Sequence, residues 1–176
     1  QPGSIVGGGG AQPDSVVQNL TVNPAPSVTI AGTTDGAEGA TPTDGLFTVT
    51  QSATTGTATV VNFSVAGAAD DATDFNIATA GNVTYNAAMN TGTVTIPAGS
   101  LSETIPIVVL DDSTVEATES VQLSITDVTG GDGATEGTPA TASINITDDD
   151  TATATFTSTS VSGAETGNRT FDVTLY

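Results

Sequence analysis

The chain contains no lysine, histidine, cysteine or tryptophan, and Arg169 is its only basic residue. Without these side chains there is no imidazole base, no thiolate nucleophile and no Schiff-base amine, so most acid-base and covalent enzyme chemistry is excluded. Transition metals that need histidine or cysteine ligands are excluded as well. Binding to phosphates requires clustered lysine and arginine, so neither nucleic acid nor an anionic membrane surface is expected as a partner.

Acidic residues are abundant by contrast: 20 Asp and Glu give a net charge of −19. Hydrophobic residues make up 36% of the chain, which is enough to build a core and argues against disorder. No apolar run approaches the roughly 18 residues of a membrane-spanning helix, so direct membrane insertion is not expected. Residues 1–20 lack the basic and apolar regions of a signal peptide, which indicates either that a signal has been removed or that the chain is a segment of a longer protein.

Apolar residues recur at every second position along most of the chain, which is the pattern of strands with one buried and one exposed face. The runs that show it are Val61–Val65, Val83–Tyr85, Val94–Ile96, Ile105–Val109, Val121–Ile125, Ile144–Ile146 and Phe171–Leu175. Turn signals separate them at Asp35-Gly36, Asp44-Gly45, Pro97–Ser100 and Gly130–Gly133. No stretch has a helical stripe. The sequence therefore predicts an all-β, Ig-like antiparallel (Greek-key) β-sandwich.

The chain also shows an internal repeat. Asn19–Ile30 aligns without a gap on Asn145–Phe156, and the aligned segments are collinear with further short matches. We therefore expect residues 1–23 to be the tail strand of a preceding module or a linker. Residues 24–150 would form one complete sandwich, and residues 151–176 would contribute the first strands of a following module. The chain would then be a segment of a tandem array.

Carboxylates are clustered where the expected strands end. Asp111-Asp112 follows the strand at Ile105–Val109, and Asp148–Asp150 follows the strand at Ile144–Ile146. A sandwich gathers its loops at its two ends, so these carboxylates can converge although no basic residue is nearby. Carboxylates brought together cannot all remain ionised without a counter-charge. Oxygen ligands without histidine or cysteine select Ca²⁺, whereas Mg²⁺ prefers fewer carboxylates and retained water.

These motifs resemble the Calx-β domain family over residues 27–150, with the start of a second copy at residues 152–176. The resemblance rests on the following motifs, in order: Gly36-Ala37-Glu38-Gly39, Ala68–Phe75, Val83-Thr84-Tyr85, Pro97-Ala98-Gly99, Val108–Asp112 with Glu116 and Glu119, and Ile146–Asp150. The apolar strand that runs into Asp-Asp-x-x-x-Glu-x-x-Glu is the most specific of them.

The resemblance implies a set of calcium ligands. The expected ligands are Glu38, Asp74, Asp111, Asp112, Glu116, Asp148, Asp149 and Asp150, with Glu119 as a further or supporting ligand. The sequence departs from the family pattern in two places. Asp70 and Asp71 add acids before Phe75, and the first loop is lengthened from Ala40 to Asp44.

The function that follows is structural rather than enzymatic. We expect a calcium-binding module of an extracellular tandem-repeat adhesin or surface fibre, in which Ca²⁺ stiffens the modules and their junctions, with neighbouring modules of the same protein as partners. One alternative is a complete filament subunit that polymerises head to tail by strand addition through its two ends. A second alternative is a calcium-sensing regulatory domain.

Two further readings have less support. A glycosidase-like carboxylate pair would need an acid in an apolar pocket and aromatic platforms for sugar, and the chain indicates neither. Sequons for N-glycosylation occur at Asn19, Asn62, Asn82, Asn145 and Asn168. On the alternating pattern Asn62, Asn82 and Asn145 point outward, which would permit glycans.

Overall fold

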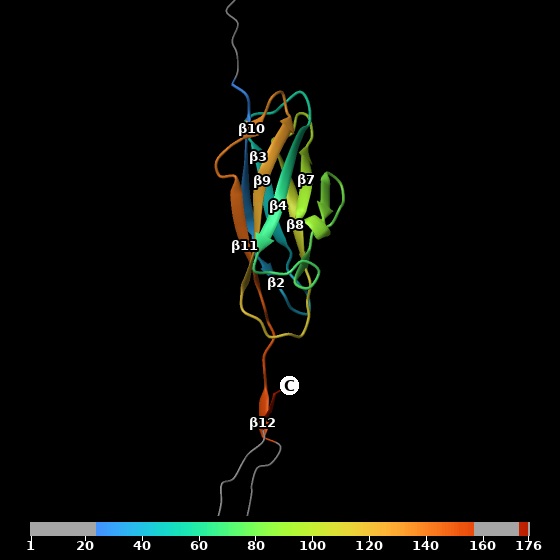
Figure 1. Ribbon diagram of the computed structural model, residues 1–176, viewed down its shortest axis with the longest axis vertical. Coiled ribbons are helices and arrows are strands. Elements are labelled where there is room, and N and C mark those ends of the chain that lie inside the picture. The colour runs from blue at the N-terminus through green and yellow to red at the C-terminus, as the bar shows by residue number, and fades with distance from the viewer. Residues whose placement is uncertain (1–23, 157–172, 176) are drawn as a thin grey trace, which may run out of the picture.

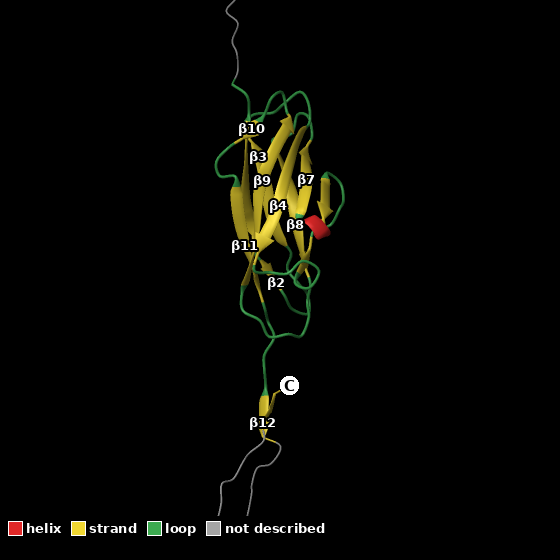
Figure 2. Cartoon of the chain, viewed as in Figure 1, coloured by secondary structure: helices red, strands yellow, loops and turns green. Residues whose placement is uncertain are grey.

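Two β-sheets pack face to face in the computed structural model, which describes residues 24–156 and 173–175 (Figure 1). The five-stranded sheet has the order β10 (Thr135–Glu136), β1 (Ser27–Thr34), β3 (Gly45–Gln51), β8 (Ser102–Val109) and β5 (Phe75–Asn76). The six-stranded sheet has the order β2 (Gly36–Ala37), β11 (Thr141–Thr147), β9 (Glu119–Gly130), β4 (Thr59–Gly67), β7 (Thr91–Ile96) and β6 (Val83–Asn86). In the described part of the chain the only helical element is the 3₁₀ turn η1 (Ala87–Met89) (Figure 2). The predicted all-β sandwich is confirmed.

The alternating runs inside the described residues all form strands, but two details of the prediction were wrong. The sheets are not purely antiparallel, because β1 pairs with β10 and β2 pairs with β11 in parallel. Asp35-Gly36 is not a turn between hairpin strands. The chain switches there from the five-stranded to the six-stranded sheet, and Gly36 begins β2. The alternation also did not single out β1 or β3, although both carry buried residues at every second position over part of their length.

Inward-facing side chains from both sheets form one apolar core. Its largest fully buried members are Phe47, Phe63 and Phe75, and isoleucines and valines from nearly every longer strand fill the space between them. Their burial is the main favourable term in folding, because apolar surface leaves water while the ladder hydrogen bonds satisfy the backbone. The core therefore fixes the strands, and the strand ends in turn fix the loops.

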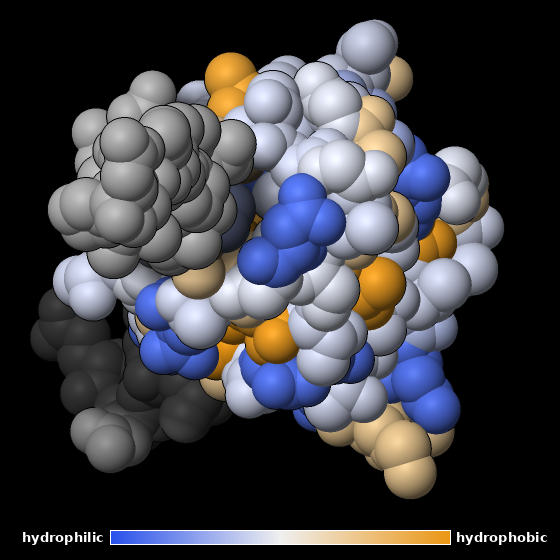
Figure 3. All heavy atoms as spheres, turned by 90° about the horizontal axis from the view of Figure 1, so that it is seen from above, coloured by the Kyte–Doolittle hydropathy of each residue, from blue (hydrophilic) through white to orange (hydrophobic). Residues whose placement is uncertain are grey.

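The loops that carry the acidic motifs lie together at one end of the sandwich. They follow β2, β8 and β11 and precede β5 and β9, and they form the lower end of the sandwich in Figure 1, above β12. The chain enters the sandwich at the opposite, upper end, where β10 lies. Viewed from that upper end, the surface is mixed, and hydrophobic residues appear only as separate spots (Figure 3).

Beyond the acidic end, β12 (Ala154–Phe156) pairs with β13 (Val173–Leu175) in an antiparallel hairpin. Residues 1–23, 157–172 and 176 lie outside the described residues. The division into a preceding tail, a complete module and a following module therefore stays a prediction. Among the described residues, none of the helical structure has the length and apolar character needed to cross a bilayer.

Candidate metal centre

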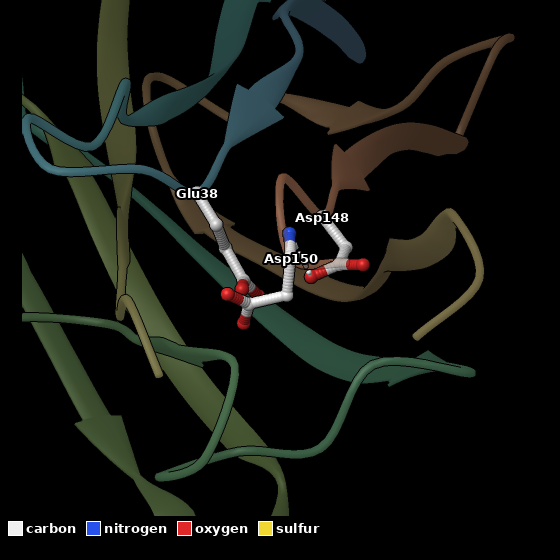
Figure 4. A group of neighbouring side chains, drawn as sticks. All are labelled: Glu38, Asp148 and Asp150. Carbon is white, nitrogen blue, oxygen red and sulfur yellow. Dashed lines mark hydrogen bonds between the residues drawn. The ribbon is translucent and has the colours of Figure 1, made fainter. Parts of the chain in front are cut away.

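Three carboxylates that follow the ends of the two parallel strands β2 and β11 form the first cluster. Glu38 directly follows β2, and Asp148 and Asp150 follow β11. One carboxylate oxygen from each residue can be chosen so that the three atoms lie within 4.8 Å of one another. The carboxylates of Glu38 and Asp150 face each other, and that of Asp148 lies beside them (Figure 4). This spacing matches oxygen atoms that share one cation.

A second cluster joins Asp74, which precedes β5, to Glu119, the first residue of β9, and to Glu116 in the loop before it. Their ligand atoms also lie within 4.8 Å of one another. Asp74 is 5% exposed, so its carboxyl group is withdrawn from water. One small pocket connects the two clusters, and it is lined by Glu38, Asp148, Asp74, Glu116, Glu119, Ala117 and Ile146.

Backbone amides hold several of these carboxylates in place. Asp148 accepts hydrogen bonds from the Glu116 N–H at 3.1 Å and from the Asp150 N–H at 3.1 Å, so it links the β8–β9 loop to the end of β11. Asp74 accepts one from the Asp70 N–H. The Glu38 N–H in turn donates to the Thr147 carbonyl at 2.9 Å, which extends the β2–β11 pairing by one bond, as far as Glu38 itself.

Two carboxylate oxygens in the first cluster have no such partner. Glu38 Oε2 and Asp150 Oδ2 are buried and accept no hydrogen bond. A buried acceptor without a partner costs about 1–3 kcal/mol, and more when it is charged. The described residues include no lysine, arginine or histidine that could reach them. These two oxygens, aimed into a cluster of acids, are where a bound cation would supply the missing partner.

The electrostatics of the cluster lead to the same requirement. Burial, reinforced by the charges of Asp112, Asp148 and further acids, raises the pKa of Glu38 to about 7. Burial and the charges of Asp148 and Asp149 likewise raise the pKa of Asp150. In the metal-free chain the folded state therefore favours the protonated forms of these acids. A cation would reverse that preference.

In the second cluster, burial raises the pKa of both glutamates, and Asp74 adds to the effect. For Glu119 the next cause is the neighbouring Asp74, which raises the pKa through a side-chain hydrogen bond and through its charge. For Glu116 the next cause is the charge of Asp74. The two clusters thus offer only oxygen ligands, and they share a deficit of positive charge. This donor set suits a hard divalent cation.

Six of the nine predicted ligands lie in the two clusters, and the remaining three do not. Asp111 accepts the Gly39 N–H at 2.8 Å, which holds the loop that carries Glu38. Asp112 accepts the Thr114 N–H at 2.6 Å and acts on Glu38 through its charge. Asp149 is exposed, with its carboxylate beside Gly39. Ligation by any of the nine residues remains a prediction.

Sequence reasoning missed Asp44, whose Oδ1 accepts the Val109 N–H at 3.1 Å. This bond links the lengthened first loop to Val109, the last residue of β8, two residues before Asp111-Asp112. In the sequence, Asp44 stood out only as part of a turn signal and as the last residue of the lengthened loop.

The predicted outward positions of the sequons can be compared with the structure. Asn82 and Asn145 are exposed and Asn62 is half-buried. The amide groups of Asn62 and Asn82 donate to Asp127 and Glu103, at 3.4 Å and 2.7 Å. Asn19 and Asn168 lie outside the described residues.

No family model matches the chain, and no curated protein matches it either. Solved structures do match. The crystal structure of the apo form of the Calx CBD1 domain is 20% identical, with a TM-score of 0.53, over 72% of this chain and 100% of that one. CBD12 from CALX1.2 is 20% identical, with a TM-score of 0.52, over 70% of this chain and 44% of that one. The calcium binding domain CBD12 of CALX1.1 is 21% identical, with a TM-score of 0.51, over 69% and 44%.

These matches confirm, at the level of the fold, the resemblance that the motifs predicted. The chain spans less than half the length of the two CBD12 structures. At about 20% identity these likenesses concern the fold alone.

The raised pKa of Glu38 predicts a stability that depends on pH when no metal is present. Between pH 4.5 and about 7 the unfolded chain releases the Glu38 proton and the folded chain retains it. The free energy of unfolding should therefore fall as the pH rises through this window. Denaturant titrations at several pH values in metal-depleted buffer measure the slope.

Glu38→Gln should reduce that slope, because the substituted side chain does not titrate. Glu136→Gln removes an exposed glutamate from β10, at the far end of the sandwich, and is the matched control, which should keep the original slope. Equal slopes in the two variants would show that Glu38 is not the group responsible.

Proposed function

We propose that this chain is a calcium-binding structural module of an extracellular tandem array, such as an adhesin or a surface fibre. The observation that carries the proposal is the pair of buried, unpartnered oxygens of Glu38 and Asp150 within a carboxylate cluster that has no basic residue. Ca²⁺ takes six to eight oxygen ligands in flexible geometry, and the two neighbouring clusters offer such ligands. The fold shared with a calcium binding domain of CALX1.1 supports the same choice.

A cation in the first cluster would also act on the junction with the next segment. Asp148 and Asp150 lie between the end of β11 and the start of β12, separated from β12 by residues 151–153. Glu38 belongs to the body of the sandwich. A cation bound by all three side chains would tie the connecting segment to the sandwich, so Ca²⁺ would stiffen the array as well as stabilise each module.

Calcium should raise the melting temperature of the chain. With about 1 mM free Ca²⁺ and a dissociation constant near 10⁻⁴ M, one site contributes about 1.4 kcal/mol. For a sandwich of this size that corresponds to about 4–7 °C. The double variant Glu38→Gln/Asp150→Asn should lose most of the increase. The double variant Glu136→Gln/Asp127→Asn makes the same change of charge at exposed positions away from the clusters and should retain it.

Differential scanning calorimetry with Ca²⁺, with Mg²⁺ and with chelator measures these shifts. Mg²⁺ should produce a smaller shift, because it demands a compact octahedral shell and retains water. A melting temperature that chelation leaves unchanged would rule out the calcium proposal.

The calcium affinity distinguishes an extracellular module from a calcium sensor. Extracellular modules bind Ca²⁺ with dissociation constants of about 10⁻⁴–10⁻³ M, whereas sensors bind at about 10⁻⁷–10⁻⁵ M. The raised pKa values of Glu38 and Asp150 make protons compete with the ion for these carboxylates, so we expect the weaker range. Isothermal titration calorimetry on the full chain measures it, and a submicromolar value would favour the sensing alternative.

The size of the chain in solution distinguishes a module from a polymerising subunit. A segment of a tandem array should remain monomeric, because the outer strands of both sheets, β10, β5, β2 and β6, are only two to four residues long and offer little edge for strand addition. Size-exclusion chromatography with light scattering should give one species near 17.2 kDa, with and without Ca²⁺. Concentration-dependent fibres would support the filament alternative.

A further inference from the structure

The first and last segments of the sandwich run side by side and in the same direction. Near the entry end, the Thr135 N–H donates to the Pro26 carbonyl at 2.9 Å, and the Gly137 N–H donates to the Val28 carbonyl at 2.7 Å. Farther along, the Ile30 N–H donates to the Pro139 carbonyl at 3.1 Å. The contact between residues 26–38 and residues 135–147 thus begins at the end where the chain enters.

The two segments remain in contact down to the acidic end. Gly32 lies so close to β11 that an added Cβ would be 2.5 Å from the Ser143 carbonyl oxygen, so this approach requires glycine. The Asn145 N–H donates to Asp35 Oδ1 at 2.8 Å, where the chain crosses between sheets. The last contact is the parallel pair β2–β11, which extends over only two residue pairs, Gly36 with Ile146 and Ala37 with Thr147.

The direction of these segments matters because the chain enters and leaves the sandwich at opposite ends (Figure 1). Tension between the ends pulls β1 and β2 toward the entry end and pulls β11 toward the acidic end. Two neighbouring parallel strands are then drawn past each other along their lengths. In this shear geometry the bonds between them carry the force together, whereas strands pulled apart from a shared end lose their bonds one at a time.

The first carboxylate cluster spans this contact. Glu38 is the first residue after β2, and Asp148 is the first residue after β11. We propose that a cation held by Glu38, Asp148 and Asp150 cross-links β2 to β11, so that it resists shearing of the sandwich when the chain is under tension. The inference rests on the proposed function, because it assigns a mechanical role to that same cation site.

The physical reason is that shearing separates the ligands. When β2 slides past β11, Glu38 moves away from Asp148 and Asp150, so the cation loses part of its ligand shell before the core is exposed. At the acidic end the backbone contact is short, two residue pairs extended by the bond from the Glu38 N–H to the Thr147 carbonyl, so a cation would add a substantial part of the resistance there. An interaction that is present in the folded state and lost in the transition state slows unfolding, and the unfolding rate governs how long a domain survives under force.

Single-molecule force spectroscopy on the full chain tests this role. The chain has no native cysteine, so handles can be attached at the N-terminus and at Thr153→Cys, an exposed position just beyond the cluster. At constant force, about 1 mM Ca²⁺ should slow unfolding by up to about tenfold, which is the linkage factor for a site with a dissociation constant near 10⁻⁴ M. Glu38→Gln should abolish the effect of calcium, and Glu136→Gln should preserve it.

A second pulling geometry separates a shear cross-link from general stabilisation. Ala53→Cys places a handle in the exposed loop after β3, next to the start of β1, where the Ser52 N–H donates to the Ser27 carbonyl at 2.9 Å. Force between the N-terminus and this handle unzips β1 from β3 and leaves the β2–β11 contact unloaded at first. Calcium should change this unfolding rate by less than about twofold.

The outcomes distinguish the inference from the proposed function. If calcium slows unfolding equally in both geometries, or in neither while still raising the melting temperature, the chain binds calcium but the shear cross-link is refuted. If calcium neither binds nor shifts the melting temperature, the proposed function itself fails. Slowing that occurs only in the shear geometry, and that is lost in Glu38→Gln, supports the inference.

Discussion

Repulsion among carboxylates is the constraint on which the rest of this structure depends. The fold draws Glu38, Asp148 and Asp150 together at one end of the sandwich, beside Asp74 and two glutamates, and residues 24–156 supply no basic side chain to accompany them. Bringing like charges together and withdrawing them from water both oppose folding. Without metal, Glu38 relieves part of this repulsion by keeping its proton to a higher pH, because its pKa is raised to about 7. At neutral pH the alternative is a cation supplied from outside.

The core enables the fold to tolerate this arrangement. Phe47, Phe63 and Phe75 are buried between sheets whose ladders end close to the acidic loops. Backbone hydrogen bonds also connect the acidic loops to one another, such as the bond from the Leu110 N–H to the Asp74 carbonyl at 2.9 Å. The apolar burial that stabilises the strands therefore also opposes the separation of the carboxylates. A cation site on a rigid frame loses less conformational entropy on binding than one on free loops.

Much of the fold could be predicted from the sequence, because apolar residues at every second position indicate a strand with one buried face. Runs such as Val61–Val65 and Ile105–Val109 became strands for that reason. The parallel pairs could not be predicted, since pairing depends on which distant segment lies alongside. Asp35-Gly36 has the composition of a turn, yet Gly36 is required there because an added Cβ would lie 2.6 Å from Val109 Cγ2. Gly36 is therefore explained by close packing against Val109 and not by a turn.

The acidic motifs located the site but could not rank its members. Asp111 and Asp148 each begin an acidic motif directly after a strand region, yet Asp148 lies in a cluster and Asp111 holds a loop through the Gly39 N–H. Which oxygen faces the pocket depends on the path of each loop, and composition does not record that path.

The near absence of basic residues from the sequence then acquires a physical meaning that depends on where the site lies. A lysine or arginine in the pocket could also offset the carboxylates, and it would do so under all conditions. An external cation makes the same stabilisation conditional on the surroundings, because the occupancy of the site follows the free concentration of the ion. The first cluster lies where the entering strand meets the departing strand, directly before the segment that leads to β12. An ion bound there would make three properties depend on its free concentration: the stability of the sandwich, the stiffness of its junction and its resistance to tension.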